Sequence, residues 1–203
     1  MHELDRRAVR GRAEQFSWEL ERFCELALRA NPNILECLHS PLVERVDDTG
    51  RELLALRDAF LSRQAHGTFV RYALGQRRRL DADVRQYGVP RWKHAMHLLR
   101  LLATCRDLLR TGRLVIDVGD DRERLLAVKR GEVSWWEVES WMTRLSEEAD
   151  AATAGSPLPA EPDRARVEDF LVRVRRASAL RAAQPGPDCE CVQVVAGGGL
   201  VGE

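Results

Sequence analysis

A cationic stripe within residues 93–102 is the part of the sequence whose residue types and spacing point most directly to chemistry. Lys93, His97 and Arg100 occur at i, i+4 and i+7, which places them on one face of a helix. Most other positions in this stretch are Met or Leu. Because a cation is costly to bury without an anionic partner, the stripe predicts a phosphate or a carboxylate against it. The alternative is a solvated stripe paired with acidic neighbours.

Three further groups have the residue types of metal ligands. His94 and His97 lie at i and i+3, but no Cys or carboxylate at ligand spacing accompanies them, and zinc needs further ligands. Asp81-Ala-Asp83 has the bare form of a two-carboxylate motif; on a helix, however, these side chains diverge by about 200°. Cys189-Glu-Cys191 offers two ligands at best. The sequence therefore predicts no metal site.

Basic and aromatic residues give a weaker signal for nucleic acid. The cluster 77–79 is three arginines, which could contact phosphates, but no aromatic residue interrupts it. Of the five tryptophans, Trp135, Trp136 and Trp141 are predicted mainly to pack in the core, with base stacking the less favoured role. The chain has no nucleophile elbow, no Walker loop and no dinucleotide glycine fingerprint.

The elements that must position these residues are predicted to be helices. Apolar residues recur with a period near 3.6 throughout the chain. Candidate helix caps are Ser17, Asn31, Thr49 with Glu52, Asp120 or Asp121, and Ser134 with Glu137, and Gly112 ends one helix. Helices are predicted over about residues 16–30, from 32, from 50, 68–87, 91–111, 121–128, 134–152 and from 163.

The fold class that follows is mainly α, a bundle-like helical domain with at most one or two short strands. Residues 113–118 are the one strand-like stretch, and residues 155–159 are a linker. Residues 16–180 are predicted to form the domain, preceded by an N-terminal remnant, 1–15. Residues 181–203, rich in Gly, Pro and small side chains, are predicted to be a disordered tail.

Composition bounds the class of protein. The 203 residues are 44% hydrophobic and 32% charged, enough for a core. The 32 basic and 32 acidic residues cancel, which excludes a strongly polycationic nucleic-acid binder but not a local basic patch. Five cysteines, an odd number, do not fit a secreted disulfide framework. With no apolar run long enough for a membrane span and no signal peptide, a cytoplasmic protein is expected.

Five stretches, in this order, resemble the predicted nucleotidyltransferases of the DNA polymerase β superfamily found in bacteria and phages. They are a helix with its Asn-Pro turn at 18–36, a histidine helix at 93–102, the stretches 109–113 and 126–132, and the linker at 156–163. Together they cover about residues 16–178. The resemblance implies the helical C-terminal part of an α/β nucleotidyltransferase.

The reaction that this family implies is nucleotidyl transfer. A hydroxyl attacks the α-phosphorus of a nucleoside triphosphate, and two Mg²⁺ ions held by carboxylates stabilise the attacking and leaving oxygens. The family carries those carboxylates in an N-terminal sheet, after a Gly-Ser motif and in an Asp-x-Asp pair. Neither motif precedes residue 16 here. The expectation is therefore a truncated or inactive chain that holds no cofactor alone, although the family implies Mg²⁺ and a nucleoside triphosphate.

The resemblance also implies roles for single residues. Lys93 and Arg100 become candidates for contacts to a triphosphate or an acceptor phosphate, and His94 and His97 for orienting hydrogen bonds in the same cleft. Residues 129–130, Lys129 and Arg130, could contact a phosphate or could be a solvated helix end.

The predicted function is thus that of a nucleotidyltransferase-family protein. Its partners would be a nucleoside triphosphate and an acceptor that is an RNA, a protein or a small molecule, with no membrane involved. The alternative, from a different class, is a non-catalytic helical module that binds a partner or a nucleotide.

Overall fold

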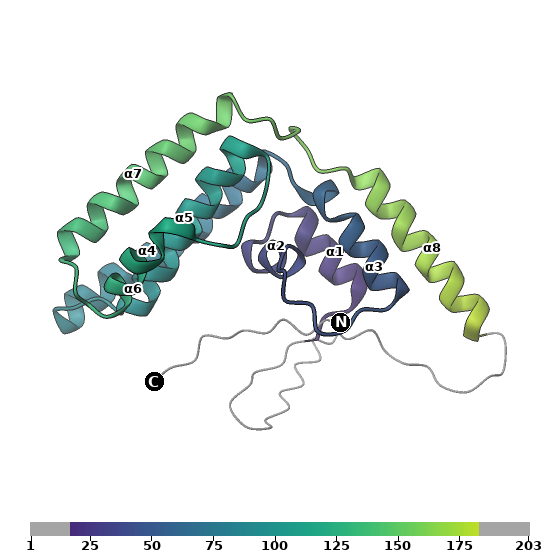
Figure 1. The fold of residues 1–203 in the computed structure, drawn as a ribbon, viewed down its shortest axis with the longest axis horizontal. Coiled ribbons are helices and arrows are strands. Elements are labelled where there is room, and N and C mark those ends of the chain that lie inside the picture. Colours follow the sequence, from purple (N-terminus) through teal and green to yellow (C-terminus); the bar gives the residue numbers. More distant parts are fainter. Residues whose placement is uncertain (1–16, 183–203) are drawn as a thin grey trace, which may run out of the picture.

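Residues 17–182 are described by a computed structural model, and over that range they form a mainly α-helical fold without a β-strand (Figure 1). The predicted fold class is confirmed. The predicted N-terminal remnant lies outside the described residues, as does the tail from residue 183. The elements are α1 (Leu20–Leu28), α2 (Pro32–Leu38), α3 (Asp48–Ala55), η1 (Arg57–Phe60), α4 (Gln64–Tyr87), α5 (Trp92–Thr111), η2 (Gly119–Asp121), α6 (Arg122–Lys129), α7 (Trp135–Ala154) and α8 (Arg164–Ala182).

Two groups of helices diverge from a shared centre (Figure 1). The helices α4, α5, α6 and α7 form one arm, in which α5 contacts the other three. The helices α1, α2, α3 and α8 form the other arm. Each arm has its own buried apolar cluster, and α5 contributes to both: Leu98 and Leu99 to the bundle core, Leu101 and Leu108 to the other. The arms are therefore joined through a continuous helix.

Several helix ends form where local sequence signals predicted them. The Asn31 side chain accepts hydrogen bonds from the backbone N–H groups of Asn33, at 3.1 Å, and Ile34, at 3.3 Å. Ser134 and Glu137 form the reciprocal capping box that begins α7. Gly112 ends α5 with φ of 71°, a left-handed conformation that favours glycine. Such signals are short-range, so the sequence alone is enough to locate them.

Two predicted caps are wrong because a nearby carboxylate takes the role. Glu19, not Ser17, caps α1, and its side chain accepts from two backbone N–H groups at 3.0 and 2.8 Å. Asp47 caps α3 by accepting from the Gly50 N–H at 2.7 Å, so Thr49 falls inside the first turn. A carboxylate also complements the positive end of the helix dipole, which a hydroxyl does less well. Asp121 precedes α6 but makes no side-chain cap hydrogen bond.

The expected strand at 113–118 is also wrong. These residues run without regular secondary structure from Gly112 to η2. A strand needs a partner for its backbone groups, and the described residues offer none. Leu114 is instead buried against the α1–α3 core, and Ile116 packs partly against the same cluster.

The α4 helix begins at Gln64, four residues before the predicted start. Its first turn is held by tertiary contacts: Ala65 is fully buried, and His66 Nε2 lies 2.6 Å from Asp150 Oδ1 of α7. The predicted linker at 155–159 has no helix but is fastened to the core. The Arg63 N–H donates to the Pro159 carbonyl at 2.8 Å, which holds the connection between α7 and α8 in place.

Candidate functional site

The predicted cationic stripe lies on α5, the helix that joins the two cores. The helix is continuous over all stripe positions, so Lys93, His97 and Arg100 share a face as predicted. Exposure changes along that face. Lys93 is exposed at the first turn of α5, whereas His94, His97 and Arg100 are half-buried. The stripe therefore has an open end and a packed end.

At the packed end, Arg100 forms a two-pronged ion pair with Glu36 of α2. Its Nη1 donates to Oε1 at 2.8 Å and its Nη2 to Oε2 at 3.0 Å, the parallel geometry that makes such pairs strong. The side chains are only 20% and 16% exposed. The anionic partner that the stripe predicted is thus, at Arg100, a carboxylate from within the chain. This pair ties α5 to α2 across the junction of the two arms.

The same guanidinium fixes the tautomer of His97. Arg100 Nη2 lies 3.2 Å from His97 Nδ1, and because a guanidinium can only donate, Nδ1 must be the unprotonated nitrogen. The His97 pKa is lowered mainly by burial, then by Arg100 and His94, while Glu36 acts in the opposite direction. His97 is therefore held neutral, with its Nε2–H as the remaining donor.

We expect the free energy of unfolding to decrease as the pH falls below the ordinary histidine value of 6.5. A histidine whose pKa is lowered in the folded state binds protons more readily when unfolded, so its stabilising effect is present above 6.5 and lost as the pH falls through its folded value. His97→Gln should flatten this pH dependence. Urea unfolding at several pH values measures it, and an unchanged slope in the variant would contradict the assignment.

His39 needs separate treatment in that experiment. Its pKa is also lowered, chiefly by burial and then by Arg57, with Asp58 opposing. His39→Gln is therefore run in parallel, and the two effects should add because the two histidines have different partners.

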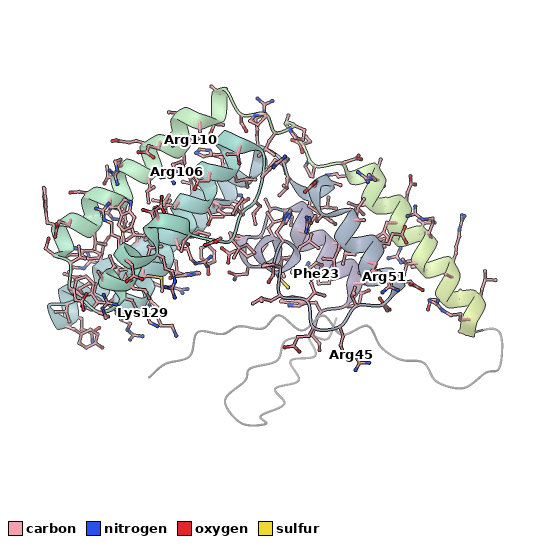
Figure 2. The ribbon with its side chains drawn as sticks, viewed as in Figure 1. Phe23, Arg45, Arg51, Arg106, Arg110 and Lys129 are labelled. Carbon is pink, nitrogen blue, oxygen red and sulfur yellow. The ribbon has the colours of Figure 1, made fainter. Side chains whose placement is uncertain are left out.

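The second predicted group, Lys129 and Arg130, lies at the end of α6. The outward position of Lys129 at the end of the bundle is seen in Figure 2. Arg130 is engaged with Glu132 through hydrogen bonds of 2.6 and 2.8 Å. The next residue, Gly131, has φ of 72°, and a Cβ there would lie 2.8 Å from the Trp92 indole nitrogen. This close approach brings the end of α6 against the start of α5.

Packing therefore brings the chain segments that carry the two groups of candidate residues to the same end of the bundle. Lys93 follows Trp92 directly, and Lys129 precedes Gly131 by two residues. Neither lysine forms an ion pair with any residue in the described range. These are also the only two lysines in the chain, beside 30 arginines.

The other ligand-type residues do not assemble into a metal site within residues 17–182. No group of three or more His, Cys, Asp or Glu side chains there could hold a metal ion. Asp81 and Asp83 lie on a helix as predicted, and Asp83 pairs with Arg91 at 3.5 Å. Cys189 and Cys191 lie outside the described residues. The side chains of residues 17–182 do not fit a two-Mg²⁺ site.

Glu36 is the residue that sequence reasoning missed. It lies inside one of the stretches that carried the family resemblance, yet nothing in the spacing of the stripe indicated it as the partner of Arg100. A usable signal was present, because Glu36 is an acidic residue placed between the buried positions Leu35 and Leu38 of a short apolar helix. A carboxylate in such a position usually has a cationic partner.

None of the helices in the described range has the length and apolar character needed to cross a bilayer.

The fold and the site define a mainly α-helical protein with a cationic face on α5. At one end of that face Arg100 is paired with Glu36, and at the other end Lys93 is exposed. The chain belongs to the RNA repair pathway DNA polymerase beta family, whose model matches residues 6–173. This supports the resemblance to polymerase-β-like nucleotidyltransferases. Comparisons with curated proteins and with solved structures found no match.

Proposed function

We propose that this protein takes part in nucleotidyl transfer during RNA repair in the cytoplasm, with RNA as the acceptor. The helical part would bind the phosphates of a nucleoside triphosphate at the open end of the α5 stripe. Lys93 and His94 would contact the phosphates directly, and Lys129 and Arg130 would add positive charge from the end of α6. At the packed end of the same face, Arg100 would position α5 against α2, and His97 would orient hydrogen bonds.

The main support for this proposal is the exposure and position of the Lys93 side chain. It is exposed, lacks an ion-pair partner within residues 17–182, and lies in the first turn of the 20-residue α5. The N-terminus of a long helix carries partial positive charge and unpaired N–H groups, which favour a phosphate. The contact between Gly131 and Trp92 places a second lysine at the same end of the bundle. The arrangement is that of an anion-binding end rather than of a neutralised surface.

The second candidate function is a non-catalytic module that binds a nucleotide or a partner. It is favoured by the lack of a metal-binding carboxylate group within the described residues. The two candidate functions are distinguished by whether a labelled RNA product forms. A transferase moves label from a nucleoside triphosphate labelled at the α-phosphate onto an RNA acceptor, whereas a binding module retains the triphosphate intact.

Lys93→Ala should weaken binding of Mg²⁺-ATP or Mg²⁺-GTP roughly tenfold, as expected for the loss of one charge-assisted contact of about 1.4 kcal/mol. Isothermal titration calorimetry of the full chain measures this. The matched control is Arg45→Ala, which removes an exposed cation from the loop between α2 and α3, in the other arm (Figure 2). Equal affinities of wild type and Lys93→Ala would reject the site, and no binding by folded wild type would reject nucleotide binding by this chain.

A further inference from the structure

A straight row of arginines runs along the outer face of α4. Arg71, Arg78 and Arg85 are spaced seven residues apart, so they lie on one side of the helix at intervals of about 10.5 Å. All three are exposed, and within the described residues none forms an ion pair. Arg71 donates to the Thr68 hydroxyl at 3.2 Å. We call these three residues the arginine row.

An exposed tryptophan lies on α7, which runs alongside α4. Arg77 of α4 pairs with Glu139 of α7 at 3.0 Å, and Leu74 lines a cavity together with Thr143. Residue numbers rise along α4 as they fall along α7, so the two helices are antiparallel there. Trp136 is seven residues before Thr143, on the same face of α7, and it is 74% exposed. The indole therefore flanks the turn of α4 that follows Arg77.

The cavity between the two helices has a volume of about 210 Å³. This is below the roughly 300–1,000 Å³ of pockets that hold drug-sized ligands, so it suits one flat ring system better than a larger ligand. Leu74 is half-exposed at its edge. The walls are largely apolar, with Val70 and Met142 among them, and the edge is polar, with Arg77, Thr143 and Glu147.

The charges at this surface favour a polyanion. Residues 71–85 of α4 contain five arginines and two aspartates. Asp83 is paired with Arg91, and Arg77 with Glu139, so Asp81 is the acidic residue of this segment that faces the remaining arginines. Glu147 is an acidic group on the far edge of the cavity. The sequence showed basic residues without an aromatic among them, and the structure supplies the aromatic from α7.

We propose that this face of α4 and α7 binds a single-stranded polynucleotide. The arginine row contacts phosphates spaced along the strand, Trp136 stacks against one base, and the cavity beside Leu74 receives another. An exposed indole beside a cationic track is the arrangement that binds single strands without reading their sequence. The identification of the strand as RNA rests on the proposed function, whereas the surface itself does not.

The test is fluorescence anisotropy with a labelled single-stranded RNA of about 12 nucleotides, using the full chain. Trp136→Ala should weaken binding roughly tenfold, because stacking on one aromatic contributes about 1–3 kcal/mol per base. Trp136→Phe keeps a ring and should bind within about threefold of wild type. The matched control is Trp18→Ala, which removes another exposed indole, located before α1. Thermal unfolding confirms that each variant is folded.

The dependence on salt tests the arginine row separately. Three phosphate contacts to a single strand predict a slope of about −2 for log K against log salt concentration. Arg78→Ala should reduce the magnitude of that slope by about 0.7, and Arg45→Ala should leave it unchanged. A duplex RNA of equal length should bind more weakly, since its bases are not free to stack.

Three results would overturn the proposal. The first is no binding of the single strand by the wild-type protein, and the second is equal affinity of Trp136→Ala and Trp18→Ala for the strand. The third is a change in self-association alone in Trp136→Ala, which would indicate that Trp136 contacts a protein. Failure of this surface is distinguishable from failure of the proposed function. Nucleotide binding that depends on Lys93 without strand binding rejects only this surface. Strand binding that is tighter for DNA than for RNA of the same sequence supports the surface and counts against the RNA acceptor.

Discussion

Replacing Phe170 with alanine is expected to lower the free energy of unfolding by about 3–5 kcal/mol, the range for large-to-small changes at a buried phenylalanine. The reason is the small anchor of α8. Of its 19 residues only Val167 and Phe170 are buried, and both are fully inaccessible. For a protein of ordinary stability, such a loss is a large part of the total.

The ion pairs of α8 cannot compensate for that loss. Arg173 pairs with Glu52 and Arg175 with Glu21, but all four side chains are at least 45% exposed. Exposed pairs typically contribute about 0–1 kcal/mol each. The attachment of α8 therefore depends on the burial of Val167 and Phe170 against the α1–α3 core.

Urea unfolding measures the overall effect of Phe170→Ala, and hydrogen exchange shows where it acts. We expect the amides of α8 to lose protection first, while those of α6 and α7 keep theirs, because the described buried cluster around Phe170 contains no α6 residue and only Ala149 of α7. Leu180→Ala on the same helix is the control, since Leu180 is 69% exposed and its loss should change stability by less than about 0.5 kcal/mol. A loss below about 1 kcal/mol for Phe170→Ala would contradict this account.

Arg100→Ala is expected to cost about 2–4 kcal/mol. Removing one member of a buried pair leaves the other charge without its partner, a loss of about 3–5 kcal/mol when burial is complete. Arg100 and Glu36 retain some exposure, 20% and 16%, which reduces the penalty. The substitution also deprives His97 Nδ1 of its donor.

A double-mutant cycle isolates the pair. The variants Arg100→Ala, Glu36→Ala and the double variant should show a coupling free energy of about 1–3 kcal/mol by urea unfolding. The double replacement Arg100→Met with Glu36→Leu should be close to neutral, because it removes both charges and keeps apolar volume. The matched control is Arg22→Ala, which breaks the exposed Arg22–Glu25 pair on α1 and should cost less than about 1 kcal/mol. Equal losses for Arg100→Ala and Arg22→Ala would show that the pair is not structural.

The same variants separate two roles of the stripe. If Arg100 acts by positioning α5 against α2, folded Arg100→Met with Glu36→Leu should still bind nucleotide at Lys93, with at most a few-fold loss. If Arg100 contacts the phosphates itself, that variant should lose binding even though its stability is restored.

The features that depend on neighbouring residues can be predicted from the amino-acid sequence alone. Asn31 with Pro32, Ser134 with Glu137, and Gly112 each begin or end a helix through groups within a few positions, so their effect needs no distant partner. The period of the apolar residues determined the mainly helical fold for the same reason. Local signals fail where two candidates compete, as at Ser17 beside Glu19.

The surroundings of each candidate functional residue, in contrast, depend on long-range packing. The pairing of Arg100 with Glu36 joins residues 64 positions apart, and the contact of Gly131 with Trp92 brings two separate lysines to one end of the bundle. The pairing of Arg77 with Glu139 joins residues 62 positions apart, and it brings the segment of α7 that carries Trp136 alongside α4. The residue types show which charged and aromatic side chains are present. Which of these side chains stay accessible to a ligand depends on how distant helices pack together, and local spacing does not specify that packing.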